Sequence, residues 1–294
     1  MTAATARASH AAHRTRTEAS RVAHKAMRAA HNPWLERAAR FGYVVKGALY
    51  LLMGGLAVAV ATQRGGALTN PQGAIATVAG LPYGHVLLIL VAIGLAAYGL
   101  WGLVRAIFDP LGRGHRPSGL ADRLGYLISG CFYTSLVPFT IKLLMGAPSA
   151  GGDGGSGGSQ PFTARLLAAP GGVWLLGAIG VAWLIMSGLG QIYEALTARF
   201  RCDLESWQMS HDQLESATLV GRIGFAARGV AFSIIGVFLI QAAVNHDAYR
   251  NTGLDGALAA LAAQPPGPWL LGLVAAGLIC FGAFSLCCAR WIRV

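Results

Sequence analysis

The stretch that decides the fold is residues 40–54, RFGYVVKGALYLLMG. The same pattern returns at residues 123–137, RLGYLISGCFYTSLV, and at residues 222–236, RIGFAARGVAFSIIG. Each copy opens with Arg, and then has Gly two residues on, an aromatic residue three on, Gly seven on and an aromatic residue ten on. Residues three, four and seven apart lie on one face of an α-helix. The pattern therefore predicts one kind of helix-packing face that recurs three times along the chain.

The composition is that of an integral membrane protein. Hydrophobic residues make up 54% of the 294 residues and charged residues only 12%, which is more apolar surface than one water-soluble core can bury. A membrane-spanning helix needs about 20 apolar residues. Six stretches meet this requirement, and they are residues 44–62, 84–104, 124–145, 172–193, 223–244 and 268–289. We expect an all-α, polytopic membrane protein with six transmembrane helices.

The repeat unit consists of two spans joined by a loop that contains a short Ala-rich segment. Three such units follow a basic arm at residues 1–33 and cover residues 34–110, 118–200 and 217–294. Each unit has an even number of spans, so all three units share one orientation. This predicts parallel repeats in a pseudo-threefold arrangement about the membrane normal.

Two stretches depart from this symmetry. The middle unit has a Gly-rich loop at residues 146–159, and its second span has other residues where the neighbouring units have Gly or aromatic residues, namely Ala182, Met186 and Ser187. After the middle unit, residues 203–217 carry apolar residues at helical spacing. They predict a short amphipathic helix that caps the bundle, and a partner-binding surface is the alternative.

The positive charges gather on one side of the predicted membrane. Eight of the 23 Lys and Arg fall between the N-terminus and Arg40, whereas the three loops on the opposite side hold only Arg64, Arg165 and Arg250. By the positive-inside rule, both termini face the cytoplasm. The formal net charge of +11 then indicates contact with anionic lipid head groups and no nucleic-acid partner. We expect the basic arm to be disordered or to lie on the membrane surface.

The repeated Gly and aromatic residues predict close helix packing. Helices associate in lipid when their backbones approach closely, and Gly permits this approach. We therefore favour intramolecular packing over a pore-lining face for this stripe. The packing stripe consists of Tyr43, Gly47, Tyr50, Gly54, Tyr126, Gly130, Tyr133, Phe225, Gly229, Phe232 and Gly236.

Two cations lie inside the first and fifth predicted spans. Lys46 and Arg228 occupy the same repeat position, just before the central Gly, and Ser129 takes that position in the middle unit. An ionisable residue within a span is a functional candidate. Helical side chains lean toward the N-terminus, however, so we expect both cations to extend back to the cytoplasmic interface. The sharper hypothesis is a ring of cations that binds an anionic solute or a lipid head group, formed by Arg40, Lys46, Arg123, Arg222 and Arg228.

The sequence lacks the residues that several classes of transport, cofactor binding and catalysis require. None of the 12 Asp and Glu lies inside a predicted span, which argues against a proton-coupled or sodium-coupled transporter. The spans hold no opposed His pair for a haem, and no cluster of Cys, His and acid has metal-ligand spacing. Hydrolase, phosphate-loop and metalloprotease motifs are absent. We expect no cofactor, no metal and no enzymatic activity.

The repeat resembles a known bacterial family. The pattern Arg-x-Gly-x4-Gly-x2-aromatic opens a two-span unit whose second span is Gly-rich, as in the family called domain of unknown function 1206, which has three tandem units. The resemblance covers about residues 36–294 and departs from the family in the middle unit, at Val137, Pro161 and Ala182. It implies a bacterial inner-membrane protein with six spans and assigns no activity, ligand or catalytic residue.

The function that these observations favour is that of a non-enzymatic structural, accessory or interaction protein of the bacterial inner membrane. The missing intramembrane acids and ligands motivate this expectation. Two alternatives stay open because of the repeated cations: an uncoupled carrier or channel for an anionic or amphipathic small molecule, and an anionic-lipid-binding protein. Membrane lipids, anionic ones on the cytoplasmic side, are the expected partners, and a protein partner or a homo-oligomer is compatible with the sequence.

Overall fold

The computed structural model describes residues 33–110, 114, 117–146, 159–247 and 252–292. The predictions for the basic arm concern residues outside this part of the chain, as do those for the Gly-rich loop apart from its two ends. Within the described ranges the protein is almost entirely helical.

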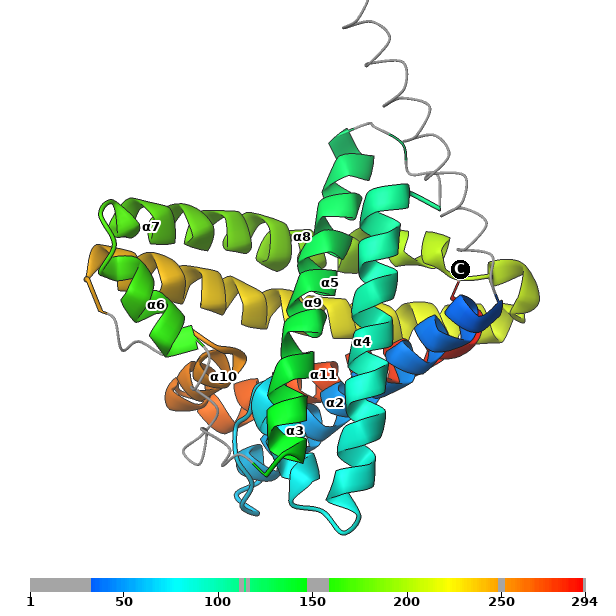
Figure 1. Cartoon of the computed structure of the whole chain (residues 1–294), viewed down its shortest axis with the longest axis horizontal. Coiled ribbons are helices and arrows are strands. Elements are labelled where there is room, and N and C mark those ends of the chain that lie inside the picture. Colours follow the sequence, from blue (N-terminus) through cyan, green and yellow to red (C-terminus); the bar gives the residue numbers. More distant parts are fainter. Residues whose placement is uncertain (1–32, 111–113, 115–116, 147–158, 248–251, 293–294) are drawn as a thin grey trace, which may run out of the picture.

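Six long helical segments run through the molecule (Figure 1), and all six are long and apolar enough to cross a membrane. The first unit contributes α2 (Pro33–Ala61) and α4 (Gly84–Phe108). The third contributes α9 (His211–Val244) and α11 (Gly267–Trp291). The middle unit contributes α5 (Pro117–Leu144) and a span in three pieces, α7 (Gly172–Trp183), the π-helical segment η1 (Leu184–Leu189) and α8 (Gly190–Thr197). The expectation of an all-α, multi-pass membrane protein is thus confirmed.

In each unit one short helix lies in the connection between the two spans. These helices are α3 (Pro71–Ala79), α6 (Ser159–Leu167) and α10 (Leu254–Ala263), and they lie toward the lower left of Figure 1. Asn70 caps α3 by accepting a hydrogen bond from the Gly73 N–H at 2.9 Å. The same side chain donates to Asp255 at 3.2 Å, which ties the first unit to the third. We call the other end of the bundle, where α2, α5 and α9 begin, the arginine end.

The closest helix packing joins one unit to the next. The second span of each unit packs against the first span of the following one: α4 on α5, α7 with α8 on α9, and α11 on α2. The central Gly of the stripe lies at each of these seams. A Cβ atom added to Gly47, Gly130 or Gly229 would meet the carbonyl oxygen of Gly282, Gly99 or Gly188 at 2.9, 3.0 and 3.1 Å, respectively. These seams therefore close the three units into a ring, while the predicted threefold axis along the membrane normal stays a prediction.

The π-helical segment keeps the middle unit in register with the other two. The interval from the first Gly of the second span to the seam Gly is 15 residues in the outer units and 16 in the middle one (Gly84 to Gly99, Gly267 to Gly282, Gly172 to Gly188). One extra residue is what a π-bulge inserts into an α-helix. Aligning Ser187 with Gly99 and Gly282 was therefore wrong by one residue, because Gly188 makes the equivalent contact in the middle unit.

The middle unit is open where the outer units are closed. In the outer units, a Cβ atom added to Gly42 or Gly224 would lie 2.6 Å from the backbone nitrogen of Tyr98 or Phe281, because the two spans of the unit touch there. At the corresponding Gly125, nothing in the described part of the chain lies within 4 Å of an added Cβ atom. The second span of the middle unit consists of α7, η1 and α8, and α5 makes only a small contact with it, at η1. Figure 1 shows α4 and α5 crossing the other two helix pairs at a steep angle.

The connection from the middle unit to the third folds over the arginine end. It consists of the 3-10 helices η2 (Arg199–Asp203) and η3 (Ser206–Gln208), after which the capping box of Ser210 and Gln213 starts α9. Residues 203–217 are therefore not a separate amphipathic helix, since their second half forms the first turns of α9. Phe200 packs its ring against Phe225 and Phe284, which anchors this connection in the core.

Candidate functional site

The three arginines that open the repeats cap helix ends. Arg123 donates from Nε to the Ala106 carbonyl at 2.8 Å and from Nη2 to the Ile107 carbonyl at 3.0 Å, at the end of α4. Arg40 donates to the Arg290 carbonyl of α11 at 2.6 Å, and Arg222 to the Leu196 carbonyl of α8 at 3.5 Å. The last carbonyls of a helix lack partners within the helix and carry partial negative charge, which a cation satisfies. Each arginine thus holds the second span of the preceding unit, and none of the three reaches into the bundle.

Lys46 points into the bundle instead of returning to the interface. Its exposed fraction is 7%, and its ammonium donates a hydrogen bond to the Tyr98 hydroxyl at 2.7 Å. Nζ lies 4.5 Å from the ring centroid of Tyr98, 5.1 Å from that of Phe281 and 5.6 Å from that of Tyr133. The expected extension toward the interface was wrong for Lys46, because aromatic rings from all three units surround its amine.

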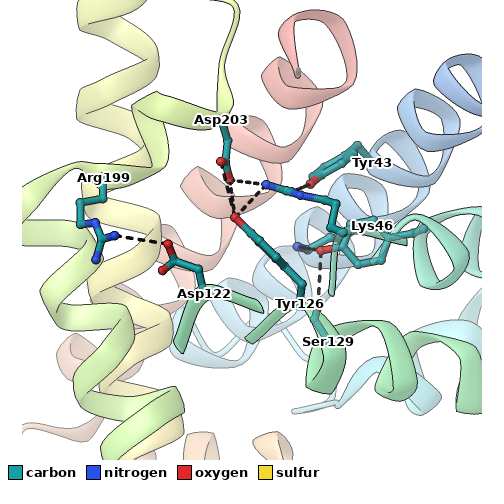
Figure 2. A network of polar contacts seen from close by, with 9 residues as sticks. Tyr43, Lys46, Asp122, Tyr126, Ser129, Arg199 and Asp203 are labelled. Atoms are coloured by element: carbon teal, nitrogen blue, oxygen red, sulfur yellow. Dashed lines mark hydrogen bonds and ion pairs between the residues drawn. The ribbon is translucent and has the colours of Figure 1, made fainter. Parts of the chain in front are cut away.

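The equivalent residues of the other units meet Lys46 at the centre of the bundle. The Ser129 hydroxyl lies 3.4 Å from the Tyr98 hydroxyl that binds Lys46, a chain of contacts that Figure 2 shows. The Arg228 guanidinium packs on Phe281, with Cζ 4.1 Å from the ring centroid, and Lys46 lies over the same ring. The repeat position before the central Gly therefore converges from three units.

Aromatic rings surround Lys46 and also pack against Arg228, which is partly exposed. Arg228 also stacks over Phe232 at 4.9 Å and Tyr50 at 5.3 Å. The hydroxyls of Tyr50 and Tyr133 are 3.5 Å apart, and the Tyr133 ring packs edge-on against Tyr98 with centroids 4.7 Å apart. We call this arrangement the cation site: Lys46, Ser129 and Arg228 with the rings of Tyr50, Tyr98, Tyr133, Phe232 and Phe281.

The cation site has two positive charges and no carboxylate. Neither Lys46 nor Arg228 forms an ion pair with any described residue. The Nε of Arg228 is buried without a hydrogen-bond partner in the described part of the chain. A buried charge is costly unless an opposite charge or several hydrogen bonds compensate it. The two cations therefore lack a negative partner, which a bound anion would supply.

A second charge cluster lies nearer the arginine end, and there the buried cation has a carboxylate partner, although its Nε has no hydrogen-bond partner among the described residues. Arg105, whose side chain is 3% exposed, forms an ion pair with Asp203 of η2 at 2.8 Å. It also donates to the hydroxyls of Tyr43 at 3.2 Å and Tyr126 at 2.8 Å, and Tyr126 in turn contacts Asp203 at 3.2 Å (Figure 2). Beside it, Arg199 pairs with Asp122 at 3.2 Å. These ion pairs fasten the connection between the middle and third units to α4 and α5.

This second cluster could not be predicted from the sequence. Arg105 stood among loop cations, and Asp203 stood at the start of a predicted amphipathic segment. Neither residue is part of the Arg, Gly and aromatic pattern that recurs in the three units, so no periodicity indicated them. No local signal indicated the pair, because Asp109 follows Arg105 by four residues and nothing in the sequence points to the more distant Asp203.

Comparisons with known proteins agree with the three-unit architecture. The family model "Domain of Unknown Function (DUF1206)" matches the chain three times, at residues 41–109, 124–198 and 223–291. The chain is also similar to the uncharacterized protein YxxB of Bacillus subtilis (strain 168), with 35% identity over 254 residues that cover 86% of this chain and 90% of the relative. No solved structure matches. The resemblance predicted from the repeat is confirmed, and the protein belongs to the DUF1206 family.

Proposed function

We propose that this protein is a non-enzymatic membrane protein that binds an anionic group at the cation site. One observation carries the proposal: Lys46 and Arg228 lie within spans, are surrounded by aromatic rings and have no carboxylate partner among the described residues. The function is therefore one of ligand binding, and it accounts for charges that packing alone does not require.

The energy balance favours a bound anion. Removing a cation from water costs several kcal/mol even after the protein relaxes, and contacts with aromatic faces return only about 0.5–2 kcal/mol. Arg105 supports this reasoning, because the same chain supplies a carboxylate and two hydroxyls to that buried cation. An anion between Lys46 and Arg228 would provide what Asp203 provides to Arg105.

The side chains indicate the chemical class of the anion. A guanidinium is a planar fork of donors that fits carboxylate and phosphate oxygens, and an ammonium adds a point charge with three donors. Ser129 offers a hydroxyl beside them, and the surrounding rings suit an apolar part of the ligand. A carboxylate or phosphate on an amphipathic molecule is the best match, and uncoupled transport of such a molecule is compatible with it.

A structural or accessory role is the second candidate. It is favoured by the three inter-unit seams, in which glycine backbones approach closely along the whole ring of helices. In that case the cation site would be an uncompensated cost of the fold. The partners would then be membrane lipids around the bundle, a protein or a second copy of the chain.

We further propose the bacterial inner membrane as the location, with both termini in the cytoplasm. The arginine end supports this orientation, since Arg40, Arg123 and Arg222 all lie at the starts of α2, α5 and α9. Reporter fusions at the C-terminus and in the loop between α9 and α10 test it. A cytoplasmic reporter should be active only at the C-terminus, and the opposite pattern would overturn the orientation.

The binding proposal is tested with the purified full chain in a non-ionic detergent. Dodecyl phosphate and inorganic phosphate are added, and the midpoint of thermal unfolding is followed. A ligand at 100 times its Kd stabilises the folded state by about 2.7 kcal/mol. We expect this stabilisation in the wild type and its loss in Lys46→Met and Arg228→Met.

The matched controls are Arg64→Gln and Arg165→Gln, which remove cations from exposed positions outside the cation site. Both should keep the phosphate-dependent shift. Equal shifts in the wild type and in the two Met variants, or no shift with either probe, would overturn the proposal and leave the structural role.

A further inference from the structure

We infer that the anion is the head group of a membrane phospholipid, which enters the cation site sideways through the open middle unit, between α5 and the span formed by α7, η1 and α8. This inference rests on the proposed function and names its ligand class. It follows from where the bundle is open, where that opening leads and what lies at its edges.

The opening is specific to the middle unit. In the outer units the backbones of Tyr98 and Phe281 close against Gly42 and Gly224, so a lipid chain has no room there. The corresponding Gly125 faces open space within the described part of the chain. Because α5 lies in a span, the space beside it is lipid in a membrane. The first and third units are thus sealed, and the second one admits a lipid.

The open face of α5 leads to Lys46. Gly125 and Ser129 are one helical turn apart and share that face. Ser129 contacts the Tyr98 hydroxyl that accepts the hydrogen bond of Lys46. The exposed side chains of Ile128 and Phe132 flank this path and offer apolar surface. A head group at Lys46 would therefore leave its acyl chains along the outer face of α5.

The opposite edge offers hydrogen-bond donors that have no acceptor. Trp183 is the last residue of α7, immediately before the π-helical segment, and its indole Nε1 is buried without a partner in the described residues. Its ring packs against Phe232, on which the Arg228 guanidinium also lies. The Arg228 Nε is likewise buried without a partner. A buried N–H without an acceptor is costly in a membrane. Trp101 and Arg105 also have such donors, but Trp183 and Arg228 both contact Phe232, so a phosphate oxygen beside this ring would serve both of them.

The route from water at the arginine end is closed. Arg105, Asp203 and Tyr126 form a bonded layer there, and Arg105 also binds Tyr43, which lies one turn before Lys46 on α2. Phe200 and Leu204 of the same connection are buried behind this layer. A free anion therefore meets a closed layer at this end and in detergent has to use the lateral opening, whereas a lipid in the bilayer already lies beside that opening. This difference favours a lipid phosphate over a free one.

The test measures retention of dioleoyl phosphatidylglycerol by the full chain, by native mass spectrometry after exchange from nanodiscs that also contain phosphatidylcholine. Gly125→Leu fills the opening at a position with free space, and Gly55→Leu is the matched control because it also faces open space but lies on α2. We expect the wild type and Gly55→Leu to retain the anionic lipid selectively. Gly125→Leu should retain about tenfold less, equivalent to about 1.4 kcal/mol.

A second variant tests the donor edge. Trp183→Phe keeps an aromatic side chain but removes the N–H together with the five-membered ring of the indole, so retention of phosphatidylglycerol should fall by about fivefold to tenfold. Binding of inorganic phosphate, measured in parallel, should be unchanged in Gly125→Leu because a small anion passes the added side chain.

The outcomes separate the two proposals. If Gly125→Leu and Gly55→Leu retain the lipid equally, or if the wild type binds inorganic phosphate but retains no lipid, sideways entry is overturned and the anion site stands. If neither phosphate nor lipid depends on Lys46 and Arg228, the proposed function itself fails.

Discussion

Arg105 and Lys46 are two buried cations that share Tyr43 as a neighbour and are held in opposite ways. Arg105 donates to the Tyr43 hydroxyl and pairs with Asp203. Lys46 lies over the Tyr43 ring, and among the described residues only the Tyr98 hydroxyl is its hydrogen-bond partner. The first arrangement completes itself within the chain. The second is complete only when something else supplies negative charge, which is why we place function at Lys46 and structure at Arg105.

The largest change in stability should follow from removing the carboxylate that pairs with Arg105. Asp203→Ala leaves a cation that is 3% exposed without its anion, and the variant should lose about 3 kcal/mol of unfolding free energy. Thermal unfolding of the detergent-solubilised protein measures the loss. Adding Arg105→Met should restore part of it, since no charge is then stranded. The control is Asp212→Ala, at an exposed position, and a loss as large in the control would contradict the assignment.

Lys46 should respond with the opposite sign. Without a bound anion, Lys46→Met removes a buried charge that has no carboxylate partner, so the variant should be more stable by about 1 kcal/mol. Arg105→Met should be less stable than the wild type, because it strands Asp203. Both are compared by the same unfolding assay after delipidation. If Lys46→Met is destabilised as much as Arg105→Met, then the two cations are held alike.

The smallest effect is expected at the cations that cap helices. Arg123→Gln should cost about 0.5–1 kcal/mol, because it removes charged hydrogen bonds to the last carbonyls of α4 at a partly exposed site. Hydrogen exchange should increase in the last turn of α4 and remain unchanged in the cation site. A change in anion binding in this variant would show that the arginine end belongs to the site after all.

Local periodicity was sufficient to predict the helices and the seams. Gly47, Gly130 and Gly229 recur at the same place in a helical pattern, and close approach in lipid requires residues of this kind, so their environment could be inferred from spacing. The convergence of Lys46, Ser129 and Arg228 was also readable, because equal repeat positions occupy equivalent places when the units form a ring.

Three features depended on contacts that no spacing encodes. The direction of Lys46 is decided by Tyr98, Tyr133 and Phe281, which come from three different units. The Arg105–Asp203 pair joins a span to a loop far along the chain. The extra residue of the fourth span was hidden, because an insertion that a π-helix absorbs leaves the apolar pattern almost intact.

The seam between α11 and α2 has a consequence for the order of synthesis. Among the six described spans, α2 precedes the other five in the chain, yet its closest packing is with α11, which follows them, and Arg40 caps the Arg290 carbonyl of that helix. Before α11 is synthesised, Gly47 and Gly54 of α2 lack the helix against which they pack. The ring of units therefore cannot close before α11 is in place, and a chain truncated before α11 lacks both the partner of α2 and the Phe281 ring that Lys46 and Arg228 share.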